Sequence, residues 1–106
     1  LNGVDGIFSI CKARKNPYFN IVEPNKIGAL KLSKEFQARS ITRRQDAPQV
    51  FEHVASIYVL STEYLLSSKS LLEGNVQGYD IGQEKSFDID SELDFTIIEF
   101  LMRQKL

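Results

Sequence analysis

The chain has 106 residues, of which 42% are hydrophobic and 25% charged, a composition typical of one small globular domain or of part of a larger one. Its one cysteine, Cys11, excludes an internal disulfide and a zinc site made of cysteines, and its one histidine, His53, excludes mechanisms that need two. The net charge of −1 gives no overall field for nucleic acid or anionic lipid, and no apolar run approaches the ~18 residues of a membrane span. We therefore expect neither nucleic acid nor membrane among its partners.

The first half of the chain favours strands. Residues 6–10 (Gly-Ile-Phe-Ser-Ile) form a short apolar run that predicts a buried strand. Two further strands are predicted at 18–22 and 27–32, joined by a hairpin turn at 23–26 in which Asn25 is able to take a left-handed conformation. Residues 33–50 show no clean period and are expected to form an extended arm or loop.

The second half alternates strands and helices. The apolar run 54–60 predicts a central strand with almost nothing facing water, and Ser61 and Thr62 predict a short helix over 62–68. A strand is expected at 75–80, between two glycines. Ser91 and Asp94 match a capping box, so a C-terminal helix should follow, with one apolar face made of Leu93, Ile97, Ile98 and Leu101.

Two carboxylates lie close together just before that helix, in the segment 86–90 (Ser-Phe-Asp-Ile-Asp). In an extended segment Asp88 and Asp90 point to the same side, about 6–7 Å apart at Cβ, while Phe87 and Ile89 face the core. Mg²⁺ prefers one or two carboxylates together with substrate phosphates and water, so this segment is a candidate magnesium site. The alternative is that these acids only favour the helix N-terminus through its dipole.

The segment 42–48 contains two adjacent arginines, Arg43 and Arg44, followed by Gln45. Paired arginines can bind a carboxylate or phosphate, and the alternative is a solvated loop in which one arginine pairs with Asp46. Residues 1–53 carry nine basic and five acidic residues, whereas residues 54–106 carry four basic and nine acidic ones. This asymmetry indicates a contact for an anionic group in the first half and a metal site in the second, or a mere fluctuation of surface charge.

Three segments in register, 43–48 (RRQDAP), 55–58 (ASIY) and 86–95 (SFDIDSELDF), resemble the acylneuraminate cytidylyltransferases. These are the CMP-sialic acid synthetases and their relatives that act on legionaminic and similar nonulosonic acids. Residues 16–23 (NPYFNIVE) are similar to the entry of that family's dimerisation arm. The resemblance covers nearly the whole chain, and the Ala-Ser form at 55–56 is closer to the legionaminic-type members.

The resemblance implies an α/β fold, namely the C-terminal part of a Rossmann-like three-layer nucleotide-sugar-transferase fold. Residues 17–52 would form a β-rich dimerisation arm, and residues 1–16 and 53–106 core strands and helices. It further implies a cytoplasmic homodimeric nucleotidyltransferase that makes a CMP-sugar and pyrophosphate from CTP and a nonulosonic acid. Asp88 and Asp90 would hold Mg²⁺ and serve catalysis, Arg44 and Gln45 would contact the sugar acid of the neighbouring subunit, and Tyr58 would line the sugar pocket.

The sequence departs from the family pattern in two respects. Val54 stands where the family usually has Asn, which removes one hydrogen bond to the sugar. The family's nucleotide-binding loop, basic and containing glycine, belongs to an N-terminal half that these residues do not include, so we expect the 106 residues alone to be inactive. A noncatalytic dimerisation module is therefore the second hypothesis. We interpret His53 as a surface or packing residue and Cys11 as a buried thiol.

Overall fold

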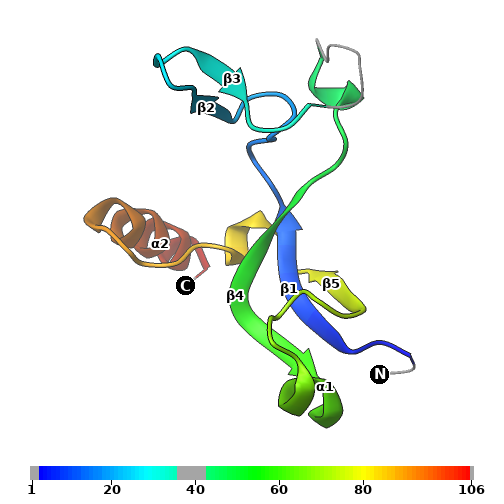
Figure 1. Ribbon diagram of the computed structural model, residues 1–106. Coiled ribbons are helices and arrows are strands. Elements are labelled where there is room, and N and C mark those ends of the chain that lie inside the picture. The colour runs from blue at the N-terminus through cyan, green and yellow to red at the C-terminus, as the bar shows by residue number, and fades with distance from the viewer. Residues whose placement is uncertain (1–2, 36–42, 106) are drawn as a thin grey trace. The chain divides into compact units, whose positions relative to one another are not determined.

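The computed structural model describes residues 3–35 and 43–105, which belong to two compact units (Figure 1). The first unit joins Leu1–Lys12 with Glu52–Leu106, and the second is Ala13–Phe51. The first unit contains both strands and helices, so the predicted mixed α/β content is confirmed.

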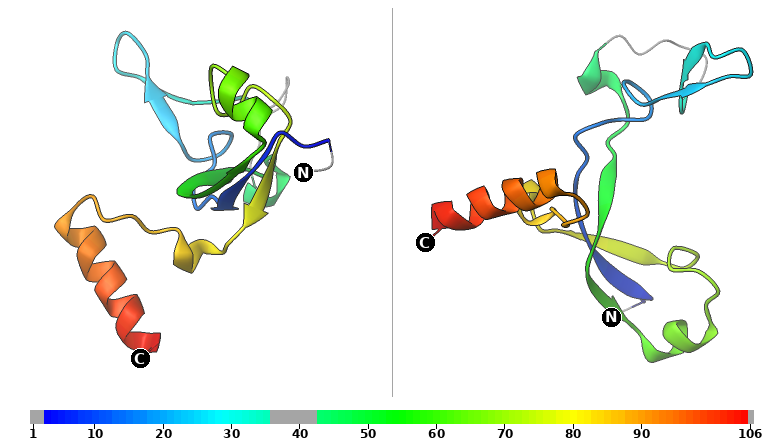
Figure 2. Two further views of the ribbon diagram at one scale, coloured as in Figure 1. Left: turned by 90° about the horizontal axis from the view of Figure 1, so that it is seen from below. Right: turned by 90° about the vertical axis from the view of Figure 1, so that its left-hand side faces the viewer.

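The first unit is built on a three-stranded sheet in the order β4-β1-β5. Strand β1 (Gly6–Lys12) pairs in parallel with β5 (Val76–Asp80), and Figure 2 shows β1 between its two neighbours. Strand β4 (Phe51–Leu60) runs antiparallel to β1, because the Ser61 amide donates to the Asp5 carbonyl at one end and Cys11 lies beside Glu52 at the other. The predicted strands at 6–10 and 75–80 are confirmed.

The position predicted for β4 is wrong. The apolar run 54–60 was expected at the centre of the sheet, but β4 is an edge strand in this chain and only Val54 of it is buried. The central strand is β1, where Phe8, Ser9 and Cys11 are 2% exposed or less. Hydrophobicity alone could not separate the two positions, because a strand that is apolar on both faces has the same sequence pattern at the edge as at the centre.

Gly78 allows two strands of this sheet to pack closely. It lies opposite Phe8 in the β1–β5 register, and a Cβ at this position would overlap the side chain of Ile10. The absence of a side chain therefore leaves room for Ile10 on the face of the sheet that also carries Phe8.

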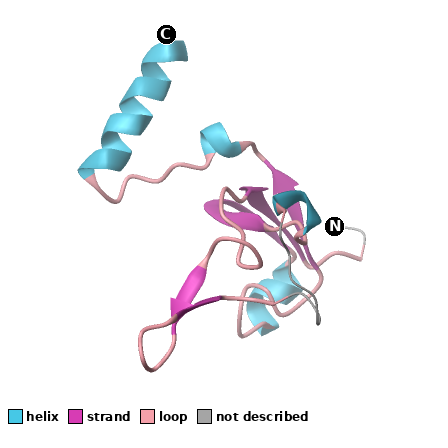
Figure 3. Ribbon diagram, turned by 90° about the horizontal axis from the view of Figure 1, so that it is seen from above, coloured by secondary structure: helices cyan, strands magenta, loops and turns pink. Residues whose placement is uncertain are grey.

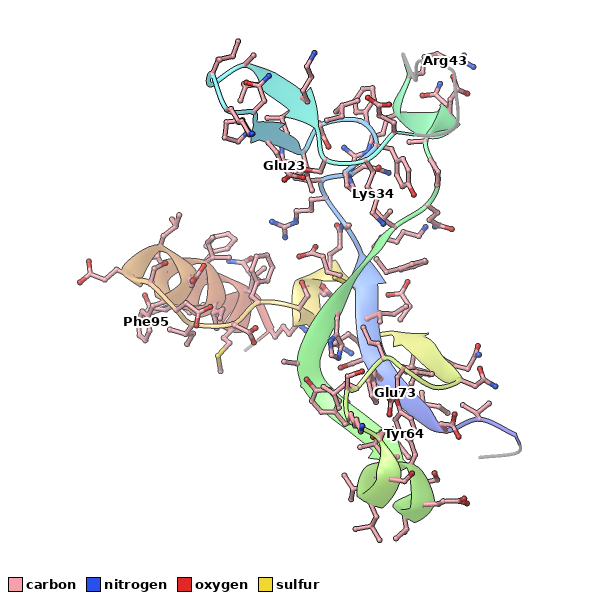
Figure 4. The ribbon with its side chains drawn as sticks, in the orientation of Figure 1. Glu23, Lys34, Arg43, Tyr64, Glu73 and Phe95 are labelled. Atoms are coloured by element: carbon pink, nitrogen blue, oxygen red, sulfur yellow. The ribbon has the colours of Figure 1, made fainter. Side chains whose placement is uncertain are left out.

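Helix α1 (Thr62–Ser67) follows β4 as predicted. The Ser61 side chain accepts a hydrogen bond from the Tyr64 amide, which satisfies one of the amides left open at the start of the helix. Tyr64 is the one buried residue of α1, and Figure 4 shows it pointing toward the loop that carries Glu73. Its hydroxyl bonds the carbonyls of Ser70 and Leu71 and the Gly74 amide, so one side chain organises the whole connection to β5.

Helix α2 (Glu92–Lys105) is also confirmed, together with its capping box. The Ser91 hydroxyl accepts from the Asp94 amide at 3.2 Å, and the Asp94 carboxylate accepts from the Ser91 amide at 3.1 Å. The apolar face expected on α2 is only half-buried at Ile97, Ile98 and Leu101, and Leu93 is 68% exposed. No described residue of α2 is buried, so its apolar side chains remain available to other surfaces.

The second unit contains a two-stranded antiparallel hairpin of β2 (Val22–Pro24) and β3 (Leu30–Leu32), drawn in magenta in Figure 3. A hairpin was predicted here, but with strands at 18–22 and 27–32 and a turn at 23–26, and these bounds are wrong. The Asn25 side chain accepts from the amides of Ile27 and Ala29, and Gly28 takes a positive φ of 85°. The loop is therefore closed over 25–29, and residues 22–24 are free to pair as a strand.

Within the predicted arm at 33–50, residues 43–50 contain a single helical turn, η1 (Arg44–Asp46), and residues 36–42 lie outside the described part of the chain. The segment 82–86 holds a second such turn, η2 (Gln83–Lys85). Over the residues that the structure describes, no helix has the length and apolar character to cross a membrane.

Candidate functional site

Asp88 and Asp90 lie in the irregular segment between η2 and α2, and both are exposed. The segment is held at both ends. The Asp90 amide donates to the Asp94 carboxylate at 3.0 Å, which ties it to the capping box of α2. Phe87 is half-buried and lines a hollow of about 150 Å³ with Ile98, Leu101 and Met102 of α2. Ile89, which was expected in the core, is instead 55% exposed, because the segment does not continue the sheet.

The donor set of this segment suits Mg²⁺. Asp88 and Asp90 offer carboxylate oxygens, the ligands that a hard cation prefers, and neither takes part in an ion pair within residues 3–35 and 43–105. Across the same residues no three His, Cys, Asp or Glu side chains converge on a common point. A cation held here would thus take its other ligands from substrate phosphates and water, as Mg²⁺ does in many phosphate-binding sites.

Arg43 and Arg44 have different partners in the second unit. The Arg43 guanidinium makes a two-pronged contact with Asp46 at 2.9 and 3.2 Å, which is the solvated pairing that the sequence left open as an alternative. The Nη2 atom of Arg44 donates to the carbonyls of Ala13 and Arg14. Arg44 is exposed, and this backbone anchor fixes its base. Within the described part of the chain, the hydrogen bonds of Arg44 are made by Nη2, so its Nε and Nη1 donors could each donate singly to an anion.

Tyr58 belongs to a cluster of three rings in the first unit. Phe8 stacks on His53 with ring centres 5.2 Å apart, and Tyr58 meets both rings edge-on, at 5.0 Å from Phe8 and 5.3 Å from His53. Tyr58 is 40% exposed, so one side of its ring is packed and the rest faces outward. A ring held in this way can form the wall of a pocket. The interpretation of His53 as a surface or packing residue is confirmed, since it is exposed and its ring stacks on Phe8.

Cys11 is fully buried and reduced, as expected, and its sulfur lies 3.9 Å from the Glu52 carboxylate. It belongs to the core and offers no accessible nucleophile.

The predicted site residues are divided between the two units. Asp88, Asp90 and Tyr58 belong to the first unit, and Arg44 and Gln45, which are both exposed, belong to the second. Ser9 is a residue that sequence reasoning did not single out, since a serine inside an apolar strand carries no motif. In the structure it is 2% exposed and bonds the backbone of β4 at two points.

No protein-family model matches the chain. The CMP-N,N'-diacetyllegionaminic acid synthase of Campylobacter jejuni subsp. jejuni serotype O:2 is 44% identical over 93 residues, which cover 88% of this chain and 38% of that protein. The post-translational flagellin modification protein B of Campylobacter coli is 36% identical over 104 residues, which cover 98% of this chain and 43% of that protein. The chain is a C-terminal region of the CMP-sialic-acid-type synthetase family. It spans about two fifths of the length of these two relatives, and the resemblance seen in its three sequence segments is confirmed.

Proposed function

We propose that this CMP-sialic-acid-type region forms part of a cytidylyltransferase that joins CTP and a nonulosonic acid into a CMP-sugar and releases pyrophosphate. The observation that carries the proposal is the 44% identity to a CMP-N,N'-diacetyllegionaminic acid synthase. N,N'-diacetyllegionaminic acid is therefore the first sugar acid to test. We expect the enzyme to act in the cytoplasm, with the strands of the first unit as part of a Rossmann-like three-layer fold.

Each predicted site residue has a role in this reaction. Tyr58 offers a partly packed ring as a wall for the sugar, and Arg44, with Gln45 beside it, binds the sugar carboxylate of the neighbouring subunit. Asp88 and Asp90 hold the Mg²⁺ ion and assist removal of the proton from the attacking sugar hydroxyl. When bound, Mg²⁺ supplies positive charge to the phosphate oxygens, where negative charge develops as the hydroxyl attacks the α-phosphate.

The test uses the whole protein that contains this chain. Pyrophosphate release from CTP and Mg²⁺ is measured with N,N'-diacetyllegionaminic acid and with N-acetylneuraminic acid, before and after a chelator is added. We expect turnover with a nonulosonic acid, loss of turnover with the chelator and recovery on addition of Mg²⁺. The 106 residues alone should be inactive, because they span about two fifths of the relatives' length. Absence of turnover by the whole protein with every nonulosonic acid would refute the proposal.

The second candidate function, a dimerisation module, is favoured by the surface of the hairpin. In the β2–β3 register Val22 lies opposite Leu32 and Pro24 opposite Leu30, so these four side chains share one face, while Glu23 and Lys31 pair on the other. Val22 is 46% exposed and Leu30 63% exposed. An exposed apolar face on a short hairpin is typical of a surface that another chain covers, and a second copy of this chain fits the homodimer of the proposed enzyme.

A further inference from the structure

The direction of the side chains along β4 reverses in the middle of the strand. His53 and Tyr58 are five positions apart, and in a regular strand an odd separation puts two side chains on opposite faces. Their rings nevertheless contact each other and the same ring of Phe8. The Ser61 amide donates to the Asp5 carbonyl and Glu52 lies beside Cys11, so nine steps along β4 match only six along β1. Three extra residues of β4 therefore lie between the two contacts and form an enlarged β-bulge, and this odd number reverses the faces.

The other face of the sheet gives the same result independently. Ile57 and Val59 line a hollow of about 270 Å³ together with Ile7, Phe8 and Ser9 of β1 and Tyr79 of β5. Ile7 and Ser9 are two positions apart and Ser9 lies opposite Tyr79, so these three side chains share the face away from the Phe8 side chain. Without a bulge, both residues would share the face of His53 and Phe8, because each is an even number of positions from His53. The reversal thus applies to the whole second half of β4 and not to Tyr58 alone.

The hydroxyl of Ser9 marks where the bulge lies. It donates to the Val54 carbonyl at 2.6 Å and accepts from the Ile57 amide at 3.0 Å, and a longer contact of 3.3 Å reaches the Ile57 carbonyl. A bulge withdraws backbone groups from the ladder of the neighbouring strand, and buried groups of this kind require another partner. Ser9 supplies that partner from the central strand, since it is buried and directly faces the displaced backbone.

We propose that Ser9 is a positioning residue whose hydroxyl holds the bulge in β4 and thereby turns Tyr58 onto the face of Phe8 and His53. The role assigned to Tyr58 at the sugar rests on the proposed function, whereas the bulge rests on the geometry alone. Ser9 contacts neither substrate nor metal in this scheme. It fixes the direction of Tyr58, the side chain that contacts the sugar.

Proton NMR of the full chain tests the proposal, because His53 is its only histidine and its ring signals are unambiguous. We expect a nuclear Overhauser contact between the rings of His53 and Tyr58 in the unmodified chain. Ser9→Ala should weaken or abolish this contact, and Ser9→Thr should retain it, because Thr keeps the hydroxyl and its methyl group can enter the adjoining hollow. The control Ser67→Ala, which removes an exposed hydroxyl in α1, should leave the contact unchanged. Retention of the full contact in Ser9→Ala would overturn the proposal.

A deletion keeps the proposal testable if Ser9→Ala alone fails to fold. Removing residues 55–57 takes the three extra residues out of β4, so His53 and Tyr58 become two positions apart and share a face without a bulge. The deletion combined with Ser9→Ala should therefore restore both folding and the ring contact. A double variant that remains unfolded would show that Ser9 serves some other purpose.

A kinetic measurement separates this inference from the proposed function. In the whole enzyme, Ser9→Ala should raise the KM for the nonulosonic acid by about tenfold and leave the KM for CTP unchanged. If the ring contact is lost but the KM for the sugar stays the same, the positioning role of Ser9 is supported and the place of Tyr58 in the sugar pocket is refuted.

Discussion

Tyr64 shows how one polar atom can organise a loop. Its ring is 7% exposed, and its hydroxyl connects two carbonyls and one amide of the segment 70–74. Replacing this residue by Phe keeps the ring but leaves three backbone groups without their partner. Residues 70–74 are exposed, so water can replace part of what is lost, and the three losses together should cost about 1–3 kcal/mol.

We therefore expect Tyr64→Phe to lower the free energy of unfolding by about 1–3 kcal/mol, measured by urea denaturation. Tyr79→Phe is the matched control, because Tyr79 is 67% exposed and should tolerate the same change with little effect. Equal unfolding midpoints for the two variants would contradict the role of the Tyr64 hydroxyl.

Asp88 and Asp90 provide the residue-scale test of the metal site. Asn keeps the volume and one oxygen acceptor of Asp but lacks the charge that a hard cation requires. In the whole enzyme we expect Asp88→Asn and Asp90→Asn each to lower kcat by about two orders of magnitude with the fold intact. The measurement is turnover at saturating Mg²⁺ together with the melting temperature, and the exposed Glu63→Gln of α1 is the control.

The competing explanation predicts the opposite result. If the two acids only complement the dipole of α2, each contributes about 0.3–1 kcal/mol to stability and nothing to the chemistry. Both variants would then melt slightly earlier and turn over at a nearly normal rate. That outcome would remove the metal assignment at this segment.

At the scale of elements, the capping box decides where α2 begins. Ser91→Ala removes the acceptor of the Asp94 amide and should destabilise the helix by about 1 kcal/mol. Ser70→Ala in an exposed loop is the control. Circular dichroism during thermal unfolding measures the difference, and an equal loss of stability in the two variants would contradict the capping role.

Elements with local signals could be predicted from the sequence, and elements that depend on distant partners could not. The caps at Ser61 and Ser91 lie within three residues of the amides they satisfy, so α1 and α2 were found with their starting points. The bounds of β2 depended on which of Asn25 and Gly28 closes the loop, and both are turn-forming residues. The edge position of β4 and its bulge depend on β1, more than 40 positions away.

The candidate site follows the same rule. The sequence placed Asp88 and Asp90 beside the start of α2 because the capping box is local, but it could not show that Ile89 is exposed. From the sequence, both arginines were candidates for binding an anion. Only the structure shows that Arg43 pairs with Asp46, while Arg44 donates to backbone carbonyls. Ser9 has no motif, and the signal that could have found it is the odd spacing between His53 and Tyr58 once both are known to pack on Phe8.

At the scale of the whole molecule, the two faces of the β2–β3 hairpin lead to a prediction about assembly. The face made of Val22, Pro24, Leu30 and Leu32 is apolar and partly exposed, and a stable interface built on it would bury ~1,200–2,000 Å². We expect sedimentation velocity to show a homodimer at micromolar concentration. Leu30→Gln should weaken the dimer by at least about tenfold, because it places an amide in the apolar contact.

Lys31→Gln is the matched control, since it introduces the same side chain one position further along β3 and on the opposite face of the hairpin. Both variants replace one exposed side chain of β3 by Gln. If glutamine weakened the dimer only by disturbing β3, both dimers would therefore be weakened to the same extent. Dissociation in Leu30→Gln alone would assign the interface to the apolar face, because only there does the new amide lose its contact with water on association. If the unsubstituted chain sediments as a monomer at high micromolar concentration, the dimer is refuted. The proposal that Arg44 binds the sugar of the neighbouring subunit is then refuted as well.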